Sequence, residues 1–393
     1  MPPDTAMNVV VVSGLHRRAR QRTVELLLHT VPRSVAVHHD LTEIGAGRVR
    51  RVLRDRWNVL DAEAVPLVHA CVSCTLREDL LPALLALAER GEHALCVVDA
   101  WDGVEPQPVA EALVHTVVDG RPVDGRLRLA AVVTAVDSAR LVSDLSCPDD
   151  LSERGLGAAP GDERTVAEVL ARQIEYPSTL VLHEAADPAH DEDSLPLLEQ
   201  LNPAAAVLPP QVRALTPLPS GRFDTAAAAA RVDPVSAQYP DSCADGRVRT
   251  VTWRRHRPLH PGRLHAALDE VVGSSLRSRG RFWLASRPDT VLVWDAGGDA
   301  LAVEAAGPWL ASLPPAAREL ASQRRRASAE VDWHPDTGDR GQCLCFTGVD
   351  LDVAHLTAVL DSCLLTDAEL REGERVWTAA EDPFAHALDS PVS

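Results

Sequence analysis

Two cysteines separated by two residues are the part of this sequence whose types and spacing point most clearly to chemistry. Cys71 and Cys74 lie in the stretch HACVSCTLREDLLPALLALAER, and His69 precedes them by two positions. Two thiols at this spacing can both reach one Zn²⁺ at about 2.3 Å, and a tetrahedral ion then needs two more ligands, of which His69 is one candidate. Redox-active thiols and an inert buried pair are the alternatives that the spacing leaves open.

The residues after the pair predict how the thiols are presented. Thr75 and Glu78 have the spacing of a capping box, so we expect a helix to begin directly after Cys74. A helix N-terminus lowers the pKa of nearby thiols. This arrangement therefore predicts thiolates that are ready to bind a metal.

A second stretch, VVVVSGLHRRARQRTVELLLH (residues 9–29), begins as a phosphate-binding loop begins. A valine run ends in Ser13 and Gly14, and an amphipathic pattern follows, but the loop has no further glycine. It also has no lysine, because all 39 basic residues of the chain are arginine. The alternatives are a solvated helix start, an anion or RNA-phosphate site, and a nucleotide site of weak affinity. The arginines of this loop are Arg17, Arg18, Arg20 and Arg22.

The other residues that could do chemistry favour packing. Cys343 and Cys345 occupy alternate positions of an expected strand and so share one face, where we expect them to lie in a core. A second metal site with His334 is the alternative. Tryptophans gather in the second half, where core packing is the preferred interpretation and interfaces are the alternative. They are Trp253, Trp283, Trp294, Trp309 and Trp333.

Strand-like apolar runs alternate with helical patterns through the first half of the chain. The expected strands are 8–13, 34–38, 65–69, 94–99, 129–136 and 179–183. The expected helices are 23–30, 43–56, 76–90, 106–117 and 163–175. Valine-rich runs of this kind are typical of parallel strands covered on both faces. The pattern therefore predicts an α/β fold with a mostly parallel sheet and helices on both of its faces.

The composition shifts to proline, alanine and serine from about 203 to 245, and a different pattern follows. It predicts a smaller antiparallel sheet with helices on one face. The expected strands are 247–256, 281–286, 290–295, 300–305 and 342–348, and the expected helices are 261–272, 309–326 and 353–362.

Charge and composition restrict the partners and the compartment. The net charge of −18 argues against general nucleic-acid binding, and we expect no DNA partner. Residues 16–56 differ from the rest of this acidic chain, because they contain ten arginines and only four carboxylates. The chain has no apolar run of about 18 residues, no signal-peptide pattern and no disulfide-like spacing of its eight cysteines. We therefore expect a cytoplasmic protein without a membrane partner.

Several stretches of the sequence resemble, in order, the CobW-type metallochaperone GTPases, a class that includes the HypB and UreG proteins. In the first half they are VVVVSG, ACVSCTLREDLLPALLALA and VAEVLARQIEYPSTLVL. In the second half they are RPLHPGRLHAALD, LRSRGRFWLASRPDT, GDRGQCLCFTGVDLD and LDSCLLTDAEL. The resemblance implies Zn²⁺ as the bound metal and GTP with Mg²⁺ as cofactor. It also implies a P-loop GTPase-like (CobW N-terminal) domain over 7–215, a Pro/Ala-rich connector over 216–245, a smaller α+β CobW C-terminal-like domain over 246–370 and a tail over 371–393.

The nucleotide motifs of this family are altered throughout. Its loop lysine falls on Arg20 and its Mg²⁺-binding threonine on Gln21, while its loop glycines fall on Arg17 and Ala19. Side chains intrude where a backbone must approach phosphate, and neither arginine nor glutamine replaces the lost group. The Glu-x-x-Gly motif falls on Asp99–Asp102, and the guanine-reading Asn-Lys-x-Asp falls on His183–Ala186, with Asp187 one place late.

The zinc segment is altered less. The family's middle cysteine is Ser73, and the acidic residue upstream is Pro66, but Cys71 and Cys74 remain. His69 stands where the family commonly has asparagine, so two thiolates and one imidazole could still hold zinc.

Together these features predict a zinc-homeostasis protein of the CobW type with a degenerate GTPase site, acting by binding metal and a metalloprotein client. The alternative is a non-hydrolysing zinc-starvation factor that recruits a hibernation factor to the ribosome, since the arginine-rich region would suit rRNA. The expected vestigial nucleotide site is Ser13, Gly14, Arg20 and Asp99, the metal ligands are Cys71, Cys74 and His69, and the RNA or anion contacts are Arg17, Arg18, Arg20 and Arg22.

Overall fold

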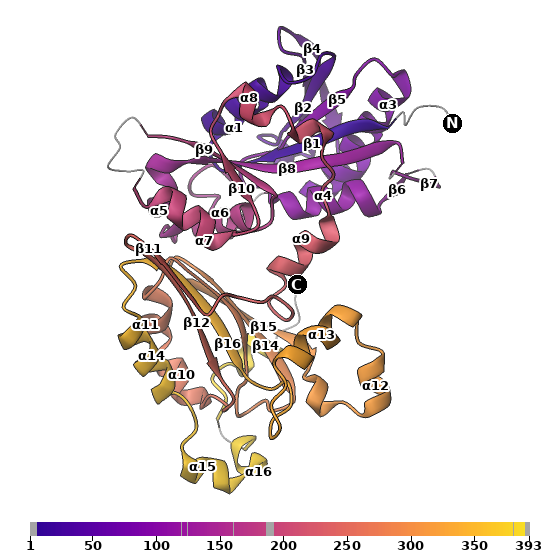
Figure 1. Ribbon diagram of the computed structural model, residues 1–393. Helices are drawn as coiled ribbons and strands as arrows, with labels where there is room; N and C mark the ends of the chain where they lie inside the picture. Colours follow the sequence, from indigo (N-terminus) through magenta and orange to yellow (C-terminus); the bar gives the residue numbers. More distant parts are fainter. Residues whose placement is uncertain are drawn as a thin grey trace. The chain divides into compact units, whose positions relative to one another are not determined.

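The protein is seen in a computed structural model that describes residues 6–118, 120–123, 125–159, 161–185, 192–379 and 381–389 (Figure 1). The chain divides into two compact units, Met1–Ala229 and Ala230–Ser393. The division falls inside the segment that the sequence predicts to be a connector. Within the described ranges, none of the helices combines the length and the apolar character that a membrane crossing requires.

The first unit is built around an eight-stranded sheet in the order β10-β9-β8-β1-β5-β2-β3-β4. Its strands are β1 (Met7–Ser13), β2 (Ser34–Asp40), β3 (Arg48–Arg54), β4 (Val59–Pro66), β5 (Leu95–Asp99), β8 (Leu127–Asp137), β9 (Thr179–His183) and β10 (Ala206–Leu208). Neighbours from β10 to β2 pair in parallel. The valines of β1 are 0% exposed, as expected for a central strand covered on both faces.

Helices lie on both sides of this sheet, so the predicted α/β class is confirmed (Figure 1). Val10 and Val12 of β1 pack against Val24 and Leu27 of the first helix, α1. The helices of this unit are α1 (Arg17–Leu28), α2 (Val72–Cys74), α3 (Leu81–Arg90), α4 (Pro106–His115), α5 (Ser138–Leu145), α6 (Val166–Glu175), α7 (Ser194–Leu201) and α8 (Val212–Leu215), and a further helix, α9 (Thr225–Val232), spans the boundary between the two units. A short hairpin joins β6 (Val117–Val118) to β7 (Arg121–Pro122).

One predicted helix is wrong. The segment 43–56 forms a 3₁₀ turn (Ile44–Ala46) and then strand β3, which pairs antiparallel with β2 and with β4. Val49, Val52 and Leu53 have the i, i+3, i+4 spacing of a helical face, which suggested a helix. A turn signal overrides that spacing, because the Asp55 carboxylate accepts the N–H groups that follow it and closes a hairpin.

The second unit contains an antiparallel sheet with helices packed on it, as predicted, but the sheet has six strands where five were expected. The expected helix 309–326 is divided into a 3₁₀ turn and two separate helices. The strand order is β11-β12-β16-β13-β14-β15. The strands are β11 (Ser242–Asp245), β12 (Val248–Arg255), β13 (Arg277–Phe282), β14 (Thr290–Gly297), β15 (Ala300–Pro308) and β16 (Gln342–Val349). The helices are α10 (Pro261–Ala266), α11 (Leu268–Gly273), α12 (Pro315–Glu319), α13 (Gln323–Val331), α14 (Val353–Ser362), α15 (Asp367–Glu372), α16 (Glu374–Trp377) and α17 (Ala385–Asp389).

The core of this unit forms where helices α10, α11 and α14 meet the sheet. Leu264, Val272 and Leu360 of these helices pack in one buried cluster with Phe282 and Trp294 of the strands. Four of the five tryptophans noted in the sequence, all but Trp333, are at most 3% exposed, which confirms core packing for them.

Candidate nucleotide and metal sites

The turn after β1 brings the backbone of Gly14 against strand β8. Gly14 has φ +142°, and a Cβ at this position would lie 2.4 Å from the carbonyl oxygen of Ala135. Only glycine avoids that clash. The buried Ser13 hydroxyl hydrogen-bonds to the hydroxyl of Thr134 at 2.7 Å. Packing within the sheet is therefore sufficient to explain why Ser13 and Gly14 are present, without a bound phosphate.

Arg20 is wholly buried beneath this turn. Its side chain is 0% exposed, and its Nε donates to Oδ1 of Asp99 at 2.8 Å. Its Nη1 donates to the carbonyl oxygen of Gly14 at 2.7 Å and to Oδ1 of Asp102. The remaining nitrogen, Nη2, has no hydrogen-bond partner within the described part of the chain. Arg20, Asp99 and Asp102, which we call the ion cluster, thus pair one buried cation with two buried carboxylates.

The two carboxylates of the ion cluster are held in place by the first sheet and by helix α6. Asp99 ends β5, beside β1, and its side chain is 3% exposed. Asp102 follows in a loop whose carbonyl groups at positions 102 and 104 accept hydrogen bonds from the buried Nε2 of Gln173 at 2.8 and 3.0 Å. The loop therefore has a fixed position, and so has the second carboxylate.

Two more contacts with carboxylates surround the N-terminus of α1. Nε2 of His16 lies 2.5 Å from Oδ2 of Asp144, and Nη2 of Arg17 lies 3.9 Å from Oδ2 of Asp102. The guanidinium of Arg17 also lies 5.4 Å from the ring centroid of Trp101. A helix N-terminus attracts anions. Here the nearby anions are the chain's own carboxylates.

This arrangement does not fit Mg²⁺ and GTP. A phosphate placed against the turn would meet two buried carboxylates, and like charges at short range repel strongly away from water. The carboxylate that could serve Mg²⁺, Asp99, is already bound to Arg20, and Gln21 points into solvent. The third motif is no better, since Nε2 of His183 hydrogen-bonds to the Thr23 hydroxyl at 2.9 Å. Asp187 lies outside the described residues.

The structure separates the four arginines predicted to contact RNA or another anion. Arg17, Arg18 and Arg22 are exposed on α1, whereas Arg20 cannot reach an external phosphate because it is buried. The sequence interpretation missed the role of Asp102. The sequence held one signal for it. Arg20 replaces the lysine of the phosphate loop and Asp102 replaces the glycine of the Glu-x-x-Gly motif, so the two altered motifs together supply a cation and a carboxylate that can pair.

Cys71 starts the metal segment in a way that the sequence did not predict. Its sulfur accepts the backbone N–H of Cys74 at 3.4 Å, so the helix begins at Val72 and not after Cys74. The expected capping box is absent, since Thr75 donates to the carbonyl of Cys71 at 3.2 Å and the Glu78 carboxylate accepts a more distant N–H.

A π-helical turn, Thr75–Leu80, follows the thiols directly. Pro82, two residues beyond it, has no N–H to donate and its ring would clash with the carbonyl of Glu78 in a regular α-helix. A wider turn avoids that conflict, and such turns are frequent at functional sites.

The two thiols lie close enough to influence each other. A hydrogen bond with Cys71, burial, and the charges of Cys71 and Glu78 raise the pKa of Cys74 above its usual value. This direction is opposite to the lowering that the expected helix start predicts for Cys74. His69 is exposed, and no group of three His, Cys, Asp or Glu side chains in the described ranges is arranged to hold a metal ion. The structure thus supplies a two-sulfur donor set with Glu78 beside it.

The second cysteine pair packs as predicted. Cys343 and Cys345 are buried in one cluster with Ala237 and Tyr239. His334, the candidate for a metal site there, stacks on another histidine, with ring centroids 4.6 Å apart.

The parallel sheet, the turn between β1 and α1, and the appended antiparallel domain define a P-loop-type GTPase fold with an additional C-terminal domain. Residues 41–209 match the CobW/HypB/UreG, nucleotide-binding domain, and residues 248–364 match the cobalamin synthesis protein cobW C-terminal domain. The chain belongs to the CobW/HypB/UreG family.

Relatives with curated names agree with this assignment. The chain is 33% identical over 370 residues to the zinc chaperone Rv0106 of Mycobacterium tuberculosis, covering 91% of this chain and 88% of that protein. It is 26% identical over 351 residues to zinc-regulated GTPase metalloprotein activator 1 of Dictyostelium discoideum, covering 85% and 73%. The Zn(II)-bound YjiA GTPase from E. coli aligns over 92% of this chain and 99% of that one, with 12% identity and a TM-score of 0.33, a similarity too low to guide the assignment.

Proposed function

We propose that this protein is a zinc metallochaperone of the CobW family that acts by binding and does not hydrolyse GTP. The observation that supports the second part is the ion cluster of Arg20, Asp99 and Asp102. These residues stand where the family resemblance places the phosphate-binding lysine, the acidic residue near Mg²⁺ and the glycine that meets the γ-phosphate. One cation and two carboxylates take over positions that would otherwise hold a charged ligand.

The energetics favour a permanent arrangement. Removing one partner from a buried ion pair leaves an unpaired charge and is unfavourable by about 3–5 kcal/mol. A nucleotide would have to displace the Arg20 contacts and then lie beside two ionised groups. The ion cluster therefore competes with nucleotide at all times.

Zinc is the cargo in this proposal, and its support is the names of the relatives together with the Cys71–Cys74 pair. Cys71 and Cys74 would provide the two sulfur ligands. A third ligand would come from His69 or Glu78 after rearrangement, or from the metalloprotein client. A site with an incompletely formed ligand set suits a carrier, because a client can complete the coordination of the ion and then remove it.

Nucleotide binding tests the proposal that the protein does not hydrolyse GTP. We would titrate the purified full-length protein with a fluorescent GTP analogue, with and without Mg²⁺, and measure phosphate release in parallel. The expected result is no Mg²⁺-dependent binding up to about 1 mM and no hydrolysis. Micromolar Mg²⁺-dependent binding that plain GTP reverses would refute the degenerate-site proposal.

Metal content tests the proposal that zinc is the cargo. Zinc bound per chain would be measured after dialysis for the wild type, Cys71→Ser, Cys74→Ser and the control Cys243→Ser, which changes an exposed cysteine elsewhere. We expect loss of zinc only in the first two variants. Equal zinc content in all four proteins would remove the metal assignment.

A second candidate is the zinc-starvation factor that recruits a hibernation factor to the ribosome. The exposed positions of Arg17, Arg18 and Arg22 favour it, because they place cations at the surface, of which Arg17 also lies 3.9 Å from Asp102. Co-sedimentation with ribosomes should then weaken in the Arg17→Glu/Arg18→Glu variant. Unchanged co-sedimentation would exclude these arginines as the rRNA contact.

A further inference from the structure

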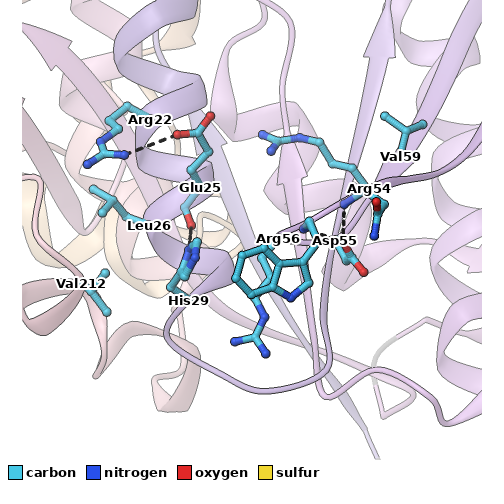
Figure 2. Close-up of a pocket in the computed structure, with 11 residues that line it drawn as sticks. Arg22, Glu25, Leu26, His29, Arg54, Asp55, Arg56, Val59 and Val212 are labelled. Carbon is cyan, nitrogen blue, oxygen red and sulfur yellow. Dashed lines mark hydrogen bonds and ion pairs between the residues drawn. The ribbon is translucent and has the colours of Figure 1, made fainter.

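A pocket of about 540 Å³ lies between the outer face of α1 and the turn that joins β3 to β4 (Figure 2). Arg22 and His29 line it from the helix, and Arg54 and Trp57 line it from the hairpin. None of the ion-cluster residues contributes to it. Its volume lies in the usual range for small-ligand sites.

The charged side chains of this pocket differ in whether they have a partner of opposite charge. Arg54 and Arg56 have no carboxylate within 4.0 Å in the described part of the chain, and Arg22 has only an exposed partner, Glu25, at 3.5 Å. The remaining carboxylate, Asp55, accepts two backbone N–H groups at 2.6 Å each. Those hydrogen bonds hold the pKa of Asp55 below its usual range, so its carboxylate is ionised and accepts hydrogen bonds within the turn. Two guanidinium groups therefore remain available to an anionic ligand.

An exposed aromatic ring stands among these cations. The Trp57 residue is 72% exposed. The guanidinium of Arg56 lies 5.1 Å from its ring centroid, and the His29 ring meets it edge-on at 6.2 Å. Nδ1 of His29 donates to the carbonyl oxygen of Glu25 at 2.7 Å, which leaves Nε2 for a ligand. An exposed indole beside guanidinium groups is typical of the stacking platforms of proteins that bind single-stranded nucleic acid.

We propose that this pocket binds one nucleotide unit, with the base stacked on Trp57 and the phosphate held by Arg54, which has no carboxylate within 4.0 Å among the described residues. The unit belongs either to a single strand of RNA or to a free nucleotide, since both present the same ring and phosphate. The net charge of −18 confines such a ligand to the arginine-rich region 16–56, in which most of the pocket lies. An acidic peptide lacks an obligatory planar ring and an anionic lipid has none, so the geometry favours the nucleotide.

The test uses fluorescence anisotropy of a labelled oligouridylate of about ten nucleotides with the full-length protein in EDTA. Mg²⁺ is left out because a phosphate-loop site would require it, so this result is independent of the proposed loss of GTP binding. Trp57→Ala and Arg54→Glu are each expected to weaken binding about tenfold, and Trp57→Phe should retain most of it. Unlabelled UMP as competitor distinguishes a free nucleotide from a strand.

The control is Arg50→Glu. Arg50 lies on the same strand, is exposed and changes the charge by the same amount, but it does not line the pocket. We expect it to weaken binding by about twofold. Equal losses of affinity in Arg50→Glu and Arg54→Glu would mean that general electrostatic attraction explains the binding, and the proposed pocket would be refuted. Unchanged binding in Trp57→Ala would also refute it. Binding to anionic phosphatidylserine vesicles without any binding to RNA or UMP would overturn the ligand class.

Discussion

Replacing Arg20 by methionine should reveal how strongly the ion cluster stabilises the first unit. Arg20→Met keeps a long apolar stem and removes the guanidinium that bonds Asp99, Asp102 and the carbonyl of Gly14. The two carboxylates then remain buried without their main cation. The half-exposed Arg17, 3.9 Å from Asp102, then remains beside them, and Nδ1 of His38 lies 3.7 Å from Oδ2 of Asp99.

The size of the effect follows from burial. The side chains of Arg20, Asp99 and Asp102 are 0%, 3% and 7% exposed, so water screens their charges little. Loss of one partner from such a group is unfavourable by about 3–5 kcal/mol. For a unit of this size that loss lowers the melting temperature by about 6–20 °C.

Thermal unfolding followed by circular dichroism would measure this shift in the full-length protein. The matched control is Arg18→Met, two residues earlier on the same helix, because Arg18 is exposed and has no ion pair in the described part of the chain. Its effect should stay within about 0.5 kcal/mol. Adding Asp102→Asn to Arg20→Met removes one orphaned charge, so the double variant should lose less than the sum of the two single variants.

Two results would refute this reasoning. If Arg20→Met melted at the same temperature as Arg18→Met, the buried guanidinium would contribute no net stability. If the effects of Arg20→Met and Asp102→Asn were additive, the two residues would not act on each other, and the proposal that the ion cluster blocks the nucleotide site would lose its energetic basis.

Other variants test packing and titration. Gly280→Ala should destabilise the second unit by more than about 2 kcal/mol, because Gly280 has φ +151° and a Cβ there would lie 2.0 Å from a carbonyl oxygen of β16. The control Gly273→Ala should be neutral in the same thermal unfolding experiment, because a Cβ there would meet no atom within 4 Å. Burial lowers the pKa of His183 below its ordinary 6.5, so the unfolded chain takes up the proton first and stability falls as the pH drops below 6.5; denaturant titrations should show less of this loss in His183→Gln. The bidentate bond from Arg263 holds the pKa of Glu369 well below its ordinary 4.5, so stability from this group is present above that value and is lost in acid, and Glu369→Gln should lack that acid-sensitive part.

Local patterns in the sequence were sufficient for most of the fold. The valine runs of β1 and β5 and the helical pattern of α6 predicted buried parallel strands and their connections, because burial on both faces requires continuous apolar residues. Local pattern failed for β3, whose apolar spacing is ambiguous. The turn at Asp55 and pairing with β2 decided that segment, and pairing is not a local property.

The sequence by itself determined that the phosphate loop had lost its glycines, its lysine and its threonine, since these are residue types at fixed spacings. It also determined family membership and the presence of two neighbouring thiols. Only the tertiary structure decided what replaced the lost groups. Arg20 lies 79 and 82 positions from Asp99 and Asp102, and the parallel pairing of β1 with β5 places the two segments side by side. The same packing left Trp57 and Arg54 facing α1. The free energy of buried charges depends on which groups meet in space, and spacing along the chain does not show that.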